Sequence, residues 1–186
     1  THIYPISDFY GCATNCYTIP NIYPISDLYG CATNCYTIPN GYSDPGSNIY
    51  PIPYIHGGPN GAFYDSFVPV QQVLATSGKL VLAVNPRGSS TYGNDFMLAV
   101  LKDWGGEDYL DLMEAVDRVS ERRYVDTGRL GIHGYSYGGY MTGWAVGHTD
   151  RFRAAVVGAP CMDLYSMYGT SDLSLIHISE PTRPRL

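Results

Sequence analysis

The stretch that decides the fold is Gly134-Tyr135-Ser136-Tyr137-Gly138-Gly139-Tyr140. It has the Gly-x-Ser-x-Gly pattern of a nucleophile elbow, a tight turn in which a serine stands between a strand and a helix. Glycines are needed two residues to either side of that serine, because side chains there would collide with the strained backbone. The pattern predicts that Ser136 is a catalytic nucleophile with an exposed hydroxyl.

The residues on either side of the turn fit this interpretation. Residues 130–133 have the pattern of a short buried strand, and residues 140–146 that of the following helix, in the order that an elbow requires. The backbone N–H of Tyr137 then points to the place where an oxyanion would form, with the helix N-terminus behind it. The alternative is a Gly-rich turn with an ordinary serine.

A second motif, His56-Gly57-Gly58-Pro59, lies upstream of the serine. Two successive glycines leave backbone N–H groups unshielded, so this loop can present a second donor to the oxyanion. We predict that Gly57 is that donor. A Gly-Pro turn without chemistry is the alternative.

Two prolines precede this loop and bear on the strand that leads into it. Proline cannot donate a hydrogen bond in a central strand. Because Pro51 and Pro53 interrupt the segment, only Tyr54 and Ile55 are predicted to remain as strand before the loop.

Strand and helix patterns alternate along the chain. Residues 79–84 are nearly continuous in apolar residues, as in a parallel strand covered on both faces, and residues 154–157 form another short apolar run. Apolar residues at helical spacing predict a crossover helix between these strands, with Glu107 and Asp108 in its first turn. These apolar residues are Leu112, Ala115, Val116 and Val119. The alternation predicts an α/β fold with a doubly wound sheet.

Several motifs occur in the order seen in the prolyl oligopeptidase family, and the chain resembles its acylaminoacyl-peptidase and dipeptidyl-peptidase branches most. The resemblance covers residues 54–172. The motifs are His56-Gly57-Gly58-Pro59, Asn85-Pro86-Arg87-Gly88-Ser89-Ser90, Tyr92-Gly93, Asp103-Trp104-Gly105, the elbow through Thr142, residues 147–152 and Ala159-Pro160.

The resemblance implies an incomplete α/β-hydrolase fold that holds the N-terminal and central part of the doubly wound sheet. It implies a serine peptidase that cleaves short peptides through an acyl-enzyme on Ser136, without a metal or organic cofactor, and with a propeller domain that filters substrates. It further implies a cytoplasmic location and a substrate pocket lined by Tyr165 and Tyr168, for which a packing role is the alternative. Arg87 is predicted to hold its loop by hydrogen bonds to carbonyl groups rather than to bind substrate carboxylates.

The chain offers no suitable partners for the serine. In this fold the orienting Asp and the basic His follow the nucleophile, and only 50 residues follow Ser136. His148 is expected to cap or pack at the end of a helix. Pairing His177 with Asp172 would leave no room for the strands and helices that separate these loops. We therefore expect that both groups are missing and that this chain is inactive.

Both ends of the chain depart from the family pattern, which divides it into segments 1–53, 54–172 and 173–186. Residues 3–21 and 22–40 are identical at 18 of 19 positions. Such near-identity indicates recent duplication, misassembly or translated noncoding repeats, so segment 1–53 is expected to be artefactual or disordered. The last segment resembles the translation of a sequencing adapter, and a real strand with a Pro-rich tail is the alternative.

Four of the five cysteines lie in the repeats, as the Cys-x3-Cys pairs Cys12/Cys16 and Cys31/Cys35. Their number and spacing would permit a zinc site or disulfides, but one pair is a copy of the other, so no metal is predicted. Cys161 is expected to be a small buried hydrophobe. A Cys-rich binding module is the non-enzymatic alternative, and a carboxylesterase or lipase is the alternative among hydrolases.

Composition excludes further classes of function. The net charge of −6 and the pI near 5.1 argue against a nucleic-acid partner, since no basic stripe is available for phosphates. No apolar run approaches the roughly 20 residues of a membrane span. The expected partner is a peptide substrate, and the oligomeric state stays open.

Overall fold

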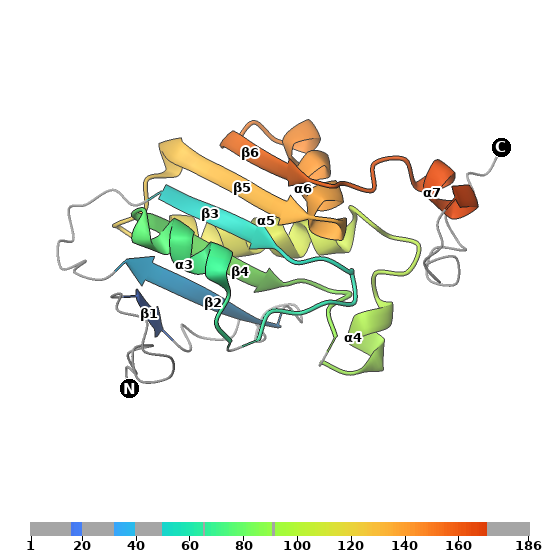
Figure 1. Ribbon diagram of the computed structural model, residues 1–186, viewed down its shortest axis with the longest axis horizontal. Helices are drawn as coiled ribbons and strands as arrows, with labels where there is room; N and C mark the ends of the chain where they lie inside the picture. The colour runs from blue at the N-terminus through green and yellow to red at the C-terminus, as the bar shows by residue number, and fades with distance from the viewer. Residues whose placement is uncertain (1–15, 20–31, 40–49, 65, 91, 171–186) are drawn as a thin grey trace.

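The computed structural model describes residues 16–19, 32–39, 50–64, 66–90 and 92–170. At its centre lies a six-stranded sheet with the strand order β1-β2-β4-β3-β5-β6 (Figure 1). The strands are β1 (Cys16–Ile19), β2 (Ala32–Pro39), β3 (Tyr50–Ile55), β4 (Lys79–Asn85), β5 (Leu130–Tyr135) and β6 (Phe152–Gly158). The helices are α3 (Pro69–Thr76), α4 (Asn94–Leu98), α5 (Glu107–Ser120), α6 (Tyr137–His148) and α7 (Leu164–Thr170), with a 3-10 turn at Thr127–Arg129.

The part of the sheet formed by β4, β3, β5 and β6 is parallel. Its strands alternate with α3, α5 and α6 along the chain, so the predicted α/β alternation is confirmed. The carboxyl ends of these four strands lie at one edge of the sheet, which in Figure 1 is the side toward α7. This edge is where an open parallel sheet places its ligand-binding loops.

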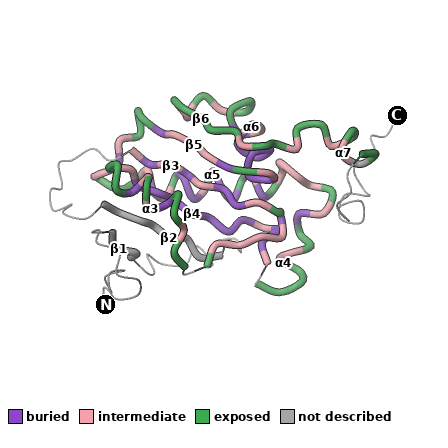
Figure 2. The backbone as a smooth tube through the Cα atoms, viewed as in Figure 1, coloured by how far each residue is buried: buried purple, intermediate pink, exposed green. Residues whose placement is uncertain are grey.

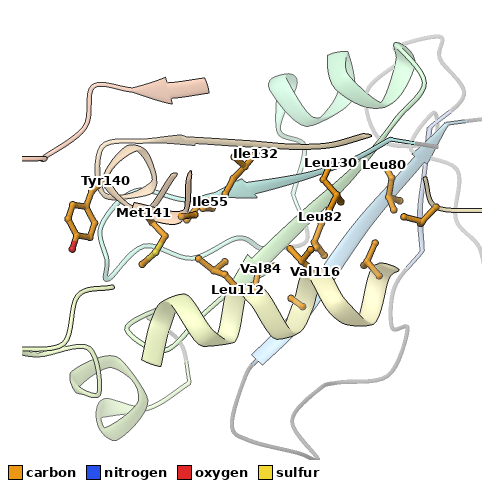
Figure 3. Close-up of a cluster of buried hydrophobic side chains, with 14 of the residues drawn as sticks. Ile55, Leu80, Leu82, Val84, Leu112, Val116, Leu130, Ile132, Tyr140 and Met141 are labelled. Carbon is orange, nitrogen blue, oxygen red and sulfur yellow. The ribbon is translucent and has the colours of Figure 1, made fainter. Parts of the chain in front are cut away.

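Helices cover the two faces of the sheet unequally. In Figure 1, α3 lies in front of the sheet and α5 lies behind it. The main hydrophobic core lies between the strands and the helices α5 and α6 (Figure 3). The predicted apolar face of α5 is confirmed, since all four of its residues are buried in this core. Because β4 is buried along almost its whole length, it anchors the sheet (Figure 2).

Strand β3 begins at Tyr50, four residues before the predicted start, so the prediction that the prolines shorten it is wrong. The strand pairs with β4 along its full length and with β5 only at Tyr54 and Ile55. Pro51 and Pro53 are two residues apart, so their missing N–H groups belong to the same edge of the strand. The prolines are tolerated because the pairing of β3 with β5 starts only at Tyr54, after both of them, so no hydrogen bond to β5 is required from the proline nitrogens.

Two segments of the repeats form the other edge of the sheet. Residues 16–19 are the first copy of residues 35–38, and the two copies pair antiparallel with Thr18 opposite Thr37, its own copy. β2 in turn pairs antiparallel with β4. Cys12 and Cys31, like the segment 171–186, lie outside the described residues. That segment 1–53 is artefactual or disordered stays a prediction.

The opposite edge strand, β6, is largely uncovered. Figure 2 shows it as mostly exposed, in contrast to β4. Its valines Val156 and Val157 point to opposite faces and both are exposed. Parallel sheets are normally covered on both faces. Cys161, just beyond the strand, packs against the core but is only partly buried, so its predicted burial is confirmed in part.

Two leucines on α5 provide a test of the core. We expect Leu112→Ala to lower the free energy of unfolding by about 2–5 kcal/mol, because it leaves a cavity between α5 and the sheet. The matched control is Leu110→Ala, two residues away, which should change stability by about 0.5 kcal/mol or less. The exposed fraction is 1% for Leu112 and 53% for Leu110. Urea denaturation measures both, and equal losses would contradict the described packing.

Candidate active site

The predicted elbow is present between β5 and α6. β5 ends at Tyr135, α6 begins at Tyr137, and Ser136 between them has φ 59° and ψ −119°. A positive φ is unfavourable for a residue with a side chain, and such strain is concentrated at functional sites. The Ser136 N–H donates a 2.9 Å hydrogen bond to the Gly158 carbonyl at the end of β6. The turn is therefore held in place by the neighbouring strand.

The glycines of the elbow allow three backbone segments to meet. A Cβ atom at Gly134 would lie 2.2 Å from the Gly138 carbonyl oxygen, and one at Gly138 would lie 2.2 Å from the carbonyl oxygen of Ile55. A Cβ atom at Gly139 would likewise lie 2.2 Å from the oxygen of Gly158. The collision expected of side chains at Gly134 and Gly138 is confirmed, and Gly139 is a further position of the same kind that was not predicted. The N-terminus of α6 thus rests directly on the ends of β3 and β6.

This contact brings the two sequence motifs together. A Cβ atom at Gly57 would lie 3.6 Å from the Cβ of Ser136 and 3.6 Å from the Tyr135 carbonyl oxygen. The structure therefore places Gly57 beside the predicted nucleophile, although the two are 79 residues apart in the sequence. That its N–H serves as an oxyanion donor stays a prediction.

His56 fixes the loop that carries Gly57. The imidazole is buried, with Nδ1 2.8 Å from the Gly57 carbonyl oxygen and Nε2 2.9 Å from Ser89 Oγ. The Ser89 hydroxyl donates to the Pro86 carbonyl, so the ring joins the loops that follow β3 and β4. Burial lowers the pKa of His56, and the bond to the Gly57 carbonyl opposes this effect. Sequence reasoning missed this role, although the signal was a histidine directly before paired glycines.

The other predicted donor, Tyr137, has a fully buried side chain. Its hydroxyl donates to Oδ2 of Asp108 on α5, and its ring lies edge-on to Trp104. The second oxygen of Asp108 accepts hydrogen bonds from the Gly105 and Tyr109 N–H groups, at 2.9 and 2.8 Å. Burial raises the pKa of Asp108 to about 6, against the lowering effect of the Tyr137 hydroxyl. The sequence assigned Asp108 only to the first turn of a helix.

Arg87 has the structural role predicted for it. Its guanidinium contacts both carboxylate oxygens of Asp111 and forms a 2.7 Å ion pair with Glu107. The Arg87 N–H also donates to Asp111, at 2.8 Å. The prediction that carbonyl groups are its partners is wrong for most of these bonds, because carboxylates of α5 hold the loop and the Glu107 carbonyl oxygen, 3.4 Å from the guanidinium, is the one carbonyl that the described contacts of this side chain include. These contacts raise the pKa of Arg87 further above its ordinary value.

The other predicted groups are not joined to the serine by any described contact. Tyr165, on α7, is 75% exposed, and the side chain of Tyr168 is outside what the structure describes. Their role in a pocket stays a prediction. Within the described residues no cluster of possible metal ligands is found, and no helix is long and apolar enough to cross a membrane.

Three histidines lie within the described residues, and none of them is hydrogen-bonded to Ser136. His56 holds the upstream loop. His148 lies 2.7 Å from the Trp144 carbonyl through Nδ1 and stacks on the Trp144 ring, which confirms the predicted packing role. His133 has a buried Nδ1 without a partner among the described residues. Asp172 and His177 lie outside the described residues.

A matched pair of glycines on α6 tests the elbow. We expect Gly138→Ala to lower the free energy of unfolding by about 2–3 kcal/mol, because the added methyl group overlaps the Ile55 carbonyl. The control is Gly147→Ala, where a Cβ atom would meet nothing within 4 Å. It should stabilise the protein by up to about 1 kcal/mol through helix propensity. Urea denaturation measures both, and effects of the same sign would count against this geometry.

The raised pKa of Asp108 predicts a pH dependence of stability. Its value of about 6 in the folded protein exceeds the unfolded value of about 3.9, so the folded state binds more protons. The stability contributed by this group is fully present below about pH 4 and is lost as the pH rises through about 6, by up to about 3 kcal/mol. We expect Asp108→Asn to abolish this loss, as measured by urea denaturation between about pH 4 and 7. The exposed Asp117→Asn is the control, and an unchanged pH profile in Asp108→Asn would refute the prediction.

Comparison with known proteins finds similar sequences among peptidases and related enzymes. An uncharacterised peptidase, YuxL, of Bacillus subtilis is 46% identical over 130 residues, which are 69% of this chain and 20% of that protein. The acylamino-acid-releasing enzyme of Homo sapiens is 31% identical over 119 residues, which are 63% of this chain and 16% of the enzyme. This chain therefore spans about a fifth of the length of the relatives that it matches.

Solved structures agree with the fold. An acylaminoacyl peptidase in complex with Z-Gly-Gly-Phe-chloromethyl ketone matches 76% of this chain and 23% of its own, with a TM-score of 0.71 and 35% identity. The uncomplexed acylaminoacyl peptidase of Pyrococcus horikoshii matches 67% of this chain and 20% of its own, with a TM-score of 0.62 and 36% identity. The fold is thus part of an α/β-hydrolase domain. Since the prolyl oligopeptidase family matches residues 65–183, and the elbow and its neighbouring loop have the expected geometry, the chain belongs to the prolyl oligopeptidase family.

Proposed function

We propose that this chain carries the nucleophile and oxyanion part of a serine peptidase site that acts on short peptides. The observation that carries the proposal is the position of Ser136, held at a positive φ at the carboxyl edge of the sheet beside Gly57. Family membership supports the same reaction class. An ordinary turn serine would have no need of this strained geometry.

The arrangement suits acyl transfer. Ser136 Oγ attacks the peptide carbonyl, and the negative charge that develops on the carbonyl oxygen is stabilised by the N–H groups of Tyr137 and Gly57. His56 also fixes the peptide that joins Gly57 to Gly58, because it contacts the Gly57 carbonyl. The C–N bond of the tetrahedral intermediate then breaks and the amine leaves with a proton, which gives the acyl-enzyme; water hydrolyses the ester, releases the carboxylic acid and restores the Ser136 hydroxyl. This chemistry uses only backbone and side-chain groups.

Proton transfer requires a base that the described residues do not supply. None of the three described histidines is hydrogen-bonded to the serine: His56 and His148 have other partners, and the His133 ring packs against Tyr54. We infer that an Asp and a His from further sequence complete the site, in the chain order of this fold. Without them the chain is expected to acylate slowly and not to turn over.

A peptide substrate is supported by the relatives. One structural neighbour was solved with Z-Gly-Gly-Phe-chloromethyl ketone, which has a peptide portion. By analogy we propose that Tyr165 and Tyr168 contact the residue that precedes the cleaved bond. A propeller domain and a cytoplasmic location are carried only by the resemblance to the family.

Covalent labelling tests the role of Ser136. We expect a fluorophosphonate probe to modify the chain once, at Ser136, and Ser136→Ala to abolish the adduct in intact-mass spectra. Ser77→Ala, which changes an exposed serine beyond α3, should leave the labelling rate unchanged. Labelling of Ser136→Ala at the original rate would contradict the proposed nucleophile.

Steady hydrolysis tests the expected inactivity. Without the base, hydrolysis of a blocked peptide should stay at least about 10³-fold below that of a complete serine peptidase. Sustained peptide hydrolysis that Ser136→Ala abolishes would overturn the expected inactivity. Activity toward p-nitrophenyl esters with none toward peptides would favour an esterase instead.

A further inference from the structure

Near the site lies a buried carboxylate, that of Asp108, which is not paired with any basic side chain among the described residues. Asp108 is 1% exposed, and it forms no ion pair among the described residues. The nearby guanidinium of Arg87 is occupied by Asp111 and Glu107. A buried carboxylate that is not neutralised is costly and is normally retained for a reason.

The hydrogen bonds of Asp108 join two elements. Its own segment supplies the N–H groups of Gly105 and Tyr109, and α6 supplies the hydroxyl of Tyr137. The other titratable groups that interact electrostatically with Asp108 are Asp103 from its own segment and Tyr140 from α6, while Asp111 interacts with Tyr137. The bond to Tyr137 is therefore the hydrogen bond by which this carboxylate holds α6.

Tyr137 stands at a sensitive position. It is the first residue of α6, where backbone N–H groups have no acceptor within the helix and remain available to a ligand. It directly follows the strained Ser136, so the backbone at this point has a tendency to relax. Its ring is buried against Trp104 and Tyr140, and its hydroxyl is bound. With the side chain fixed at its far end, the Tyr137 backbone cannot rotate independently.

We propose that Asp108 is a positioning residue of the active site, which binds the Tyr137 hydroxyl and thereby keeps the Tyr137 N–H aimed at the oxyanion. The inference rests on the proposed function of Ser136. It deepens that function, because Asp108, which itself contacts no substrate, then determines how well the Tyr137 N–H stabilises the oxyanion. The side chain of Tyr137 is the link, since it joins the Asp108 carboxylate to the Tyr137 backbone.

The link depends on the charge of Asp108. The ionised carboxylate accepts all three hydrogen bonds, whereas the protonated acid would reverse the third one and donate its own O–H to the Tyr137 hydroxyl oxygen, which replaces a charge-assisted bond with a weaker neutral bond. Its pKa of about 6 places this change in the weakly acidic range. The Tyr137 side chain is then held by a weaker bond, so its N–H should be oriented less firmly as the pH falls below about 6.

The first test measures the rate of Ser136 labelling by the fluorophosphonate probe in the full chain. We expect Tyr137→Phe and Asp108→Asn each to slow labelling by about tenfold at pH 8, and the double variant to be no slower than either single variant. The matched control is Tyr140→Phe, which removes a hydroxyl of the same helix that donates to the Trp104 carbonyl, and it should change the rate less than about twofold. Additive losses, or an equal loss in Tyr140→Phe, would overturn the proposal. Circular dichroism checks that each variant is folded.

The second test does not depend on the nucleophile. In a chain labelled with ¹⁵N-tyrosine, the Tyr137 amide is assigned by its loss in Tyr137→Phe. We expect its chemical shift to titrate with a midpoint near pH 6 in the unsubstituted chain and to be flat in Asp108→Asn. A shift that titrates equally in Asp108→Asn, or that does not titrate at all, would disprove the link. If Ser136 is not labelled but the Tyr137 amide shift titrates near pH 6, the proposed function is refuted, whereas the link between Asp108 and the Tyr137 backbone stands.

Discussion

The contact between Gly138 and the end of β3 is the constraint on which the rest of the site depends. Because Gly138 has no side chain, the first turn of α6 lies directly against the Ile55 carbonyl. This close approach places the serine after β5 beside the glycine loop after β3. Any larger residue at this position would push α6 away from β3. It would thereby also move the Tyr137 N–H away from the Gly57 loop.

Two buried polar side chains support that contact. His56 ties the glycine loop to the loop after β4, and Asp108 ties the first residue of α6 to α5. Neither belongs to an ion pair within the described residues. Instead, the polar atoms of each side chain form hydrogen bonds with backbone groups and hydroxyls. Such directional bonds fix the orientation of the attached segments better than a solvated charge would.

The sequence predicted those features that depend on local pattern. The elbow around Ser136 and the apolar face of α5 follow from short spacings, and both are present. The strand through Pro51 was missed, because its tolerance depends on where pairing with β5 starts, which no local pattern reveals. The partner of Tyr137 was missed for a similar reason, since Asp108 lies 29 residues away and meets it only through helix packing.

The uncovered strand β6 has a consequence for how such a chain is made. A ribosome that has released the chain as far as β6 exposes a sheet edge with free backbone groups and two solvent-facing valines. Among the described strands none pairs with this outer edge, so a second nascent chain can pair with it. The local concentration of such chains on neighbouring ribosomes then sets how much of the protein is lost to aggregation during synthesis.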